Sequence, residues 1–61
     1  MIPLQFVTRE RMLLARQLIR KTSHSLIEIA LEVGYANPSH FAEIFRPTAG
    51  MTPNKFRLLF G

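Results

Sequence analysis

Residues 25–45, SLIEIALEVGYANPSHFAEIF, are the stretch that decides the fold we expect. Ser25 followed by Glu28 forms a capping box, in which each side chain accepts a hydrogen bond from the other residue's backbone N–H. Gly34 ends the helix, because glycine takes the left-handed conformation at least cost. The pattern predicts a short helix over residues 26–33, whose apolar positions face the core: Leu26, Ile29, Ala30 and Val33.

A second helix is predicted directly after this turn. Asn37 is a favourable N-cap and Pro38 a favourable first helical residue. Pro47 has no N–H and its ring crowds the carbonyl of Glu43, so we expect the regular helix to stop or kink there. Residues at helical spacing are expected to point inward, and these are Phe41, Ile44, Phe45 and Thr48.

Two short helices joined by a tight turn that contains glycine match the helix-turn-helix motif. Ala30 stands four residues before Gly34, and its small side chain allows the second helix to cross close to the first. In this motif the second helix lies in the major groove of DNA, and its N-terminal residues contact the base edges. The stretch therefore indicates a DNA-binding module.

A longer helical pattern precedes the motif, over residues 3–21. Pro3 suits a first helical position, and Arg20 and Lys21 suit the negative end of the helix dipole. Its apolar side is expected to hold Phe6, Val7, Leu14, Ala15, Leu18 and Ile19, widened by Leu4, Met12 and Leu13.

A last helix is predicted over residues 52–60, with Thr52 as its cap and Pro53 at its first position. Its inward residues are expected to be Phe56, Leu59 and Phe60. No segment shows the period-two alternation of a strand. The expected fold class is all-α, a homeodomain-like helix-turn-helix of about four helices.

Composition narrows the function. The 61 residues allow one domain, and the net charge of +4 is a weak indication of a polyanionic partner. The chain has no cysteine, and His24 and His40 have few carboxylates near them, so we expect no metal and no cofactor. We find no nucleophile–base set and expect no enzyme. Without an apolar run of membrane-spanning length or a secretion signal, we expect a cytoplasmic, nucleoid-associated protein.

The sequence resembles the C-terminal half of the DNA-binding domain of AraC-type (AraC/XylS) transcription regulators. The likeness rests on three stretches: "PLQFV…RERMLLARQLI", similar to the family's linker helix; "SLIEIALEVGY", similar to the first helix of its second helix-turn-helix; and "NPSHFAEIFRPTAGMTPNKFR", similar to the recognition helix and the ending after it. Together they cover nearly the whole chain.

The resemblance implies that residues 1–61 are a partial AraC-type DNA-binding domain. Its parts are a linker helix (3–21), a helix-turn-helix (25–47) and a C-terminal helix (52–60). Regulators of this kind have two helix-turn-helix units, so we expect the first unit and any effector-binding domain to be absent, as in an excised fragment or a truncated gene product. No small-molecule effector site is expected in this chain.

The resemblance also implies which residues meet DNA. Base contacts are expected at positions 38, 39, 42 and 43, and the DNA-facing set is Asn37, Pro38, Ser39, His40, Ala42, Glu43 and Arg46. Ser39 can bond a base edge or a phosphate, Ala42 can meet a thymine methyl, and Glu43 can accept from a cytosine amino group. Glu43 departs from the family, which often has a basic residue there.

Phosphate contacts are expected at helix N-termini and nearby basic side chains, namely Ser25, Thr52, Lys55 and Arg57. Pro47 and Ala49 stand where the family often has a basic and an aromatic residue. Loss of the aromatic side chain is expected to loosen the packing between the recognition helix and the last helix. Double-stranded DNA is the expected partner.

A different class of function is the alternative: a vestigial or truncated fragment that acts through protein–protein association. Without a first unit, the helix over 3–21 would expose apolar residues such as Met12 and Leu13. The partner would be a second copy or a longer regulator. Binding of this basic helix to a membrane surface is disfavoured, because Glu10 and the modest charge give little attraction.

Overall fold

The computed structural model describes residues 1–61 and folds them into four helices without a strand. They are α1 (Leu4–Lys21), α2 (Leu26–Glu32), α3 (Pro38–Ala49) and α4 (Pro53–Phe60). The expected all-α fold of about four helices is confirmed. None of the four is both long and apolar enough to cross a membrane.

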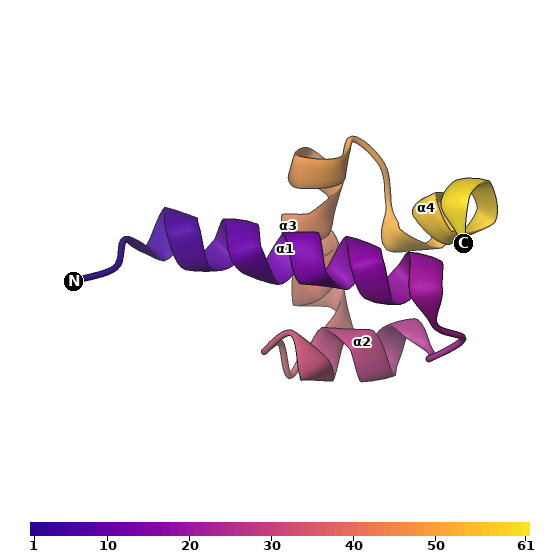
Figure 1. Ribbon diagram of the computed structural model, residues 1–61, viewed down its shortest axis with the longest axis horizontal. Coiled ribbons are helices and arrows are strands. Elements are labelled where there is room, and N and C mark those ends of the chain that lie inside the picture. The colour runs from indigo at the N-terminus through magenta and orange to yellow at the C-terminus, as the bar shows by residue number, and fades with distance from the viewer.

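Helix α1 is the axis of the molecule, and the other three helices gather around its C-terminal half (Figure 1). α3 crosses behind α1, α2 runs along one side of it, and α4 lies on the other side near its end. The chain therefore measures 36 × 21 × 20 Å, with the N-terminus projecting at one end of the long axis. This arrangement leaves the first turns of α1 without a neighbour.

The core lies where α1 and α3 cross, and it is entirely apolar. It consists of Met12, Ala15, Ile19, Ile29, Ala30, Val33, Tyr35, Phe41, Phe45 and Phe56. Phe45 stands at its centre, with its ring centroid 5.6 Å from that of Phe41 and 5.5 Å from that of Phe56, which it meets edge-on. The Phe45–Phe56 contact joins α3 to α4, while Ala49 adds only a partly buried methyl group.

The apolar side of α1 differs from the prediction. Phe6 and Leu14 are exposed, whereas Met12 is 1% exposed and belongs to the core. Phe6 and Met12 lie about 120° apart around a helix of 3.6 residues per turn, so both cannot face the same neighbours. The placement of Phe6, Leu14, Leu4 and Leu13 on the buried side was wrong, and that of Met12 is confirmed. Of the two residues that the alternative function expected to be exposed, Leu13 is exposed and Met12 is not.

Helix α4 also buries less than predicted. Phe56 is in the core and Pro53 is buried, but Leu59 and Phe60 are each more than half exposed. α4 packs mainly against α1 and α3, so it has one covered face, and these two residues lie at its outer edge. The prediction that both point inward was wrong.

Helix α3 continues through Pro47 to Ala49, so the helix does not stop at Pro47, and of the predicted stop or kink the stop was wrong. The backbone beyond the proline is held from outside the helix ladder: Arg16 of α1 donates a hydrogen bond to the carbonyl of Thr48. The Thr48 hydroxyl, which is exposed and not inward as predicted, donates to the Phe45 carbonyl at 2.9 Å. Gly50, at φ 80°, closes the helix in the left-handed conformation.

The starts of α2, α3 and α4 agree with the sequence, whereas Pro3 is the N-cap of α1 and not, as was predicted, its first helical residue. The Ser25–Glu28 capping box forms in both directions, at 3.1 and 3.2 Å. α2 ends at Glu32 with Gly34 at φ 101° in the turn, as predicted for this glycine. The Tyr35 N–H then donates to the Ala30 carbonyl at 2.8 Å, which ties the turn to the end of α2.

Candidate nucleic-acid interface

The outer face of α3 is polar and mostly exposed. Its first turn is fixed by Asn37, whose Oδ1 accepts hydrogen bonds from the N–H groups of Ser39 and His40 at 2.8 and 3.4 Å. Of the predicted DNA-facing residues, Ala42 is half-buried and the others are exposed: Asn37, Pro38, Ser39, His40, Glu43 and Arg46. Six of the seven predicted residues are thus exposed, while Phe41 and Phe45 anchor the helix in the core.

Two opposite charges stand on this face, Glu43 and Arg46. Neither lies within ion-pair distance of an opposite charge, because the chain's one close acid–base contact joins His24 Nδ1 to Glu32 Oε1 at 3.3 Å. Both groups are therefore available to a ligand. The sequence interpretation missed the contact between His24 and Glu32, since it regarded Glu32 only as an exposed neighbour and found His24 short of carboxylates.

The residues predicted to contact phosphate differ in their exposure and in the hydrogen bonds that they already make. Lys55 and Thr52 are exposed at the start of α4, where the Thr52 hydroxyl accepts from the Lys55 N–H at 3.2 Å. Ser25 is exposed, but its N–H already donates to the Glu28 carboxylate. Arg57 is partly buried, and its Nη2 is buried without a partner. Thr52 and Lys55 are thus the more accessible pair.

The capping box also sets the ionisation of Glu28. The hydrogen bond from the Ser25 backbone lowers the pKa of the Glu28 carboxyl, with smaller contributions from the Ser25 side chain and the charge of His24. The carboxylate therefore stays ionised at the start of α2, where it faces the positive end of the helix dipole. A phosphate at Ser25 would have to displace this carboxylate.

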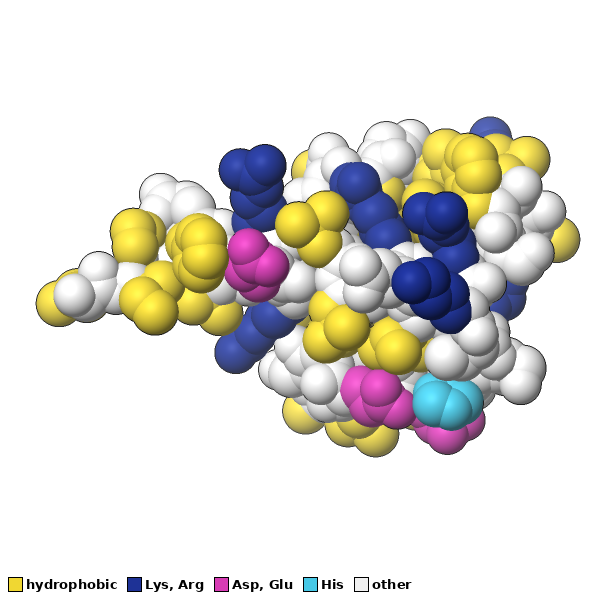
Figure 2. Space-filling model, in the orientation of Figure 1, with side chains coloured by type: hydrophobic (Ala, Val, Ile, Leu, Met, Phe, Trp, Pro, Cys, Tyr) yellow, Lys and Arg dark blue, Asp and Glu magenta, His cyan; other side chains and the backbone are white.

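Basic side chains gather along the outward side of α1, where Figure 2 shows them as dark blue over the middle and C-terminal parts of the helix. Arg9, Arg20 and Lys21 are exposed. Arg11 and Arg16 are only partly exposed, because each is engaged with another helix or turn. The two groups differ in what they can do, since only the exposed cations are free for a polyanion.

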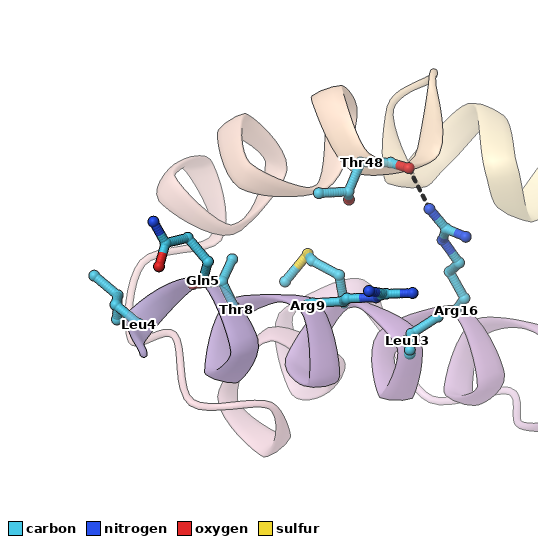
Figure 3. A pocket seen from close by; sticks show the side chains of 8 residues that line it. Leu4, Gln5, Thr8, Arg9, Leu13, Arg16 and Thr48 are labelled. Atoms are coloured by element: carbon cyan, nitrogen blue, oxygen red, sulfur yellow. Dashed lines mark hydrogen bonds between the residues drawn. The ribbon is translucent and has the colours of Figure 1, made fainter. Parts of the chain in front are cut away.

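Arg16 closes one end of a groove between α1 and the end of α3. Figure 3 shows its guanidinium directed from α1 toward Thr48, to which it is hydrogen-bonded. The groove has a volume of about 610 Å³ and is lined by Leu4, Gln5, Thr8, Arg9, Met12, Leu13, Arg16 and Thr48. The sequence did not indicate the Arg16–Thr48 bond, because nothing local links positions so far apart.

Arg11 makes the second contact that sequence reasoning missed. Its Cζ lies 5.4 Å from the centroid of the Tyr35 ring, a cation–π arrangement. Tyr35 is 8% exposed and follows Gly34 in the turn between α2 and α3. α1 is thus joined to the helix-turn-helix at its turn as well as through the core.

The arrangement defines a class of protein. A short capped helix, a glycine turn and a second helix with a buried aromatic side and an exposed polar side form a helix-turn-helix, supported by a long helix across its back. Comparison with known proteins agrees, because a family model described as a helix-turn-helix domain matches residues 1–58.

Curated relatives refine this class. The chain is 35% identical over 57 residues to an uncharacterized HTH-type transcriptional regulator of Haemophilus influenzae, which covers 93% of this chain and 19% of the relative. It is 34% identical to the virulence regulon transcriptional activator VirF of Yersinia enterocolitica, over 92% of this chain and 21% of the relative. It is also 34% identical to the HTH-type transcriptional activator RhaS of Salmonella arizonae, over 90% of this chain and 20% of the relative. The chain spans about a fifth of the length of these relatives.

A solved structure shares the fold. It is the C-terminal domain of the two-component response regulator yesN from Fusobacterium nucleatum, with a TM-score of 0.85 and 32% identity over 92% of this chain and 55% of that one. The homeodomain-like helix-turn-helix fold is thereby confirmed. The chain belongs to the AraC-type helix-turn-helix family, the DNA-binding modules of transcription regulators.

Proposed function

We propose that this chain binds DNA sequence-specifically by placing α3, from Pro38 to Arg46, in the major groove. The observation that carries the proposal is the division of α3 into two sides: Phe41 and Phe45 are buried, while the polar residues between and before them are exposed. The exposed first turns are the part of a recognition helix that reaches base edges.

Base contacts are assigned to the side chains that project furthest from the core. Ser39 donates to or accepts from a base edge, and Glu43 accepts from a cytosine amino group. Ala42, half-buried, offers its methyl group to a thymine methyl, with Pro38 beside it. Because Glu43 repels phosphate, it adds discrimination between sequences and no general affinity.

Phosphate contacts supply most of the affinity and fix the register. On the α3 side they come from Asn37, His40 and Arg46, all exposed. On the α4 side they come from Thr52 and Lys55.

Two further phosphate contacts need a rearrangement. Arg57 must turn its buried Nη2 outward, and Ser25 must release the Glu28 carboxylate. They are therefore secondary to the contacts of α3 and of the start of α4.

The proposed setting is the cytoplasm, at the nucleoid, where a regulator of transcription meets double-stranded DNA. The named relatives are transcriptional regulators and activators, and this chain aligns with about a fifth of each. One helix-turn-helix contacts few base pairs, so we expect binding by this module alone to be weak and sensitive to salt.

The test is a titration of the 61-residue chain with a random-sequence duplex, followed by selection of preferred duplexes from a random library. Backbone amide NMR shifts are expected at residues 37–46. Arg46→Ala is expected to weaken binding of the selected duplex by fivefold or more, by about 1 kcal/mol or greater. Glu43→Ala is expected to change the selected sequence.

Matched controls lie on α1, away from this face: Arg20→Ala removes the same charge as Arg46→Ala, and Glu10→Ala the same as Glu43→Ala. Shifts that are confined to the basic residues of α1 and disappear with salt contradict the proposal, because they indicate attraction by charge alone.

A second candidate function is association with another copy of this chain through α1. It is favoured by the exposed apolar residues of the first turns, Ile2, Leu4 and Phe6, and by the groove beside them. Sedimentation equilibrium tests it: a dimer that Phe6→Glu dissociates supports association, and a monomer at high concentration rejects it.

A further inference from the structure

The turn of the helix-turn-helix is in contact with a cation from outside the motif. The guanidinium of Arg11, on α1, lies over the Tyr35 ring, with Cζ 5.4 Å from the ring centroid. The same group lies against the backbone of Gly34, since a Cβ built on that glycine would meet Arg11 Cζ at 3.1 Å. Arg11 therefore packs on two adjacent residues of the turn, Gly34 and Tyr35.

The contact continues from Tyr35 to the first turn of α3. The Tyr35 ring centroid is 5.5 Å from that of His40 and 6.0 Å from that of Phe41. His40 is exposed on the proposed DNA face, whereas Phe41 is buried behind it. A displacement of Tyr35 would thus reach both sides of the recognition helix.

We propose that Arg11 is a positioning residue for DNA recognition: it holds Tyr35, and through Tyr35 it fixes the first turn of α3 relative to α1. Arg11 itself contacts no base. The inference rests on the proposed function, since it concerns the helix assigned there to the major groove. Base readout depends on matching side-chain donors and acceptors to base edges, so a small rotation of this turn reduces discrimination.

Arginine fits this role better than lysine for a geometric reason. The planar guanidinium can lie flat against an aromatic ring and a bare backbone at once, whereas an ammonium group is compact and strongly hydrated. Gly34 leaves the space that the guanidinium occupies, because any side chain there would meet it.

The test compares Arg11→Met with Arg9→Met. Both variants lose one positive charge from α1 and keep an apolar stem, but Arg9 is exposed and lines the groove between α1 and the end of α3. Affinity is measured for a duplex selected by the wild-type chain and for a random-sequence duplex. Arg11→Met is expected to lose about two- to fivefold more affinity for the selected duplex than Arg9→Met does.

Two more readouts separate positioning from stability. Arg11→Met is expected to lose no more affinity for the random duplex than Arg9→Met does, because Arg9 is the exposed cation of the two. Arg11→Lys is expected to recover part of the selected-duplex affinity. In the free protein, Arg11→Lys is expected to change NMR shifts at the residues of α1 next to position 11 and, beyond them, only at residues 34–41. These free-protein shifts carry the test if Arg11→Met does not fold.

Equal losses for Arg11→Met and Arg9→Met would overturn the proposal, and so would free-protein shifts spread over all four helices. A wild-type chain without sequence preference contradicts the proposed DNA function instead. The free-protein shifts at residues 34–41 then still decide whether Arg11 fixes the turn.

Discussion

The amino-terminal extension, residues 1–10, and the body, residues 11–61, are similar in apolar content but opposite in burial. Every buried residue lies in the body, between Met12 and Phe56. In the extension Ile2, Leu4 and Phe6 are 64%, 75% and 51% exposed. Both regions contribute to one continuous helix, so the difference does not arise from secondary structure.

The difference indicates that a side chain of α1 is buried where another helix crosses α1, and that its hydrophobicity alone does not bury it. Met12, Ala15 and Ile19 of α1 lie in the core, where the other helices pack against α1 and cover these side chains.

 Phe6 stands on the same helix, but no other helix reaches it. A helix can therefore be correctly predicted while its buried side is not.

The largest loss of stability is expected from a substitution at the centre of the body. Phe45→Ala removes a fully buried ring and is expected to lower the free energy of unfolding by about 3–5 kcal/mol, enough to unfold a domain of this size. Phe6→Ala, the matched change in the extension, is expected to cost about 0.5 kcal/mol or less. Urea unfolding followed by circular dichroism measures both. Equal losses would mean that the extension is packed in solution.

The next effect tests how α1 holds the end of α3. Arg16→Met removes the donor to the Thr48 carbonyl and is expected to cost about 1.5 kcal/mol, as for a hydrogen bond to a charged group. Hydrogen exchange of the Gly50 amide, which donates to the Arg46 carbonyl, is expected to accelerate. Arg9→Met in the extension serves as the control. If Gly50 exchanges at the wild-type rate in Arg16→Met, the turn after Pro47 does not need this bond.

A smaller effect is expected at the start of α3. Asn37→Ala removes the cap of the Ser39 and His40 amides and is expected to cost about 1 kcal/mol. Asn54→Ala in α4 makes the same chemical change without losing a cap, and alanine is the better helix former there. Thermal unfolding should place Asn37→Ala below the wild type and Asn54→Ala at or above it. The reverse order would deny Asn37 its capping role.

The smallest effect is a dependence on pH. The pKa of Glu28 is lowered in the folded chain, so its stabilising contribution is complete above the ordinary carboxyl pKa and is lost as pH falls through the lowered value. In Glu28→Gln, the free energy of unfolding should therefore fall less steeply as pH is lowered through the acid range. Its dependence on pH should be the same as in the wild type at higher pH. Glu10→Gln, in the extension, is the control. If the free energy of unfolding falls equally steeply with decreasing pH in Glu28→Gln and in the wild type, this linkage is excluded.

Local signals made most of the fold predictable. The caps at Ser25, Asn37 and Thr52 mark three helix starts, and Gly34 marks the turn, all within a few residues of the feature that they determine. The end of α3 was not predictable in this way. Pro47 is a local signal for termination, but the stabilising partner of the following turn is Arg16, far away in sequence.

In the candidate site, too, some features could be predicted from local sequence and others depend on tertiary contacts. The exposed side of α3 follows from the spacing of Phe41 and Phe45, so the DNA-facing residues could be proposed from sequence, and their contacts with DNA remain a proposal. The Arg11–Tyr35 contact could not be proposed, because it depends on where α1 crosses the turn. The exposure of Leu59 and Phe60 likewise depends on which faces of α4 have neighbours.

The sequence by itself determined the number of helices, the starts of three of them, the turn and the family, because caps, glycines and helical periodicity act over one or two turns of chain. Only the tertiary structure decided which side of α1 is buried, how far α3 extends and which arginines are free. Those outcomes depend on contacts between residues distant in sequence, and a contact of that kind leaves no periodic pattern in either partner.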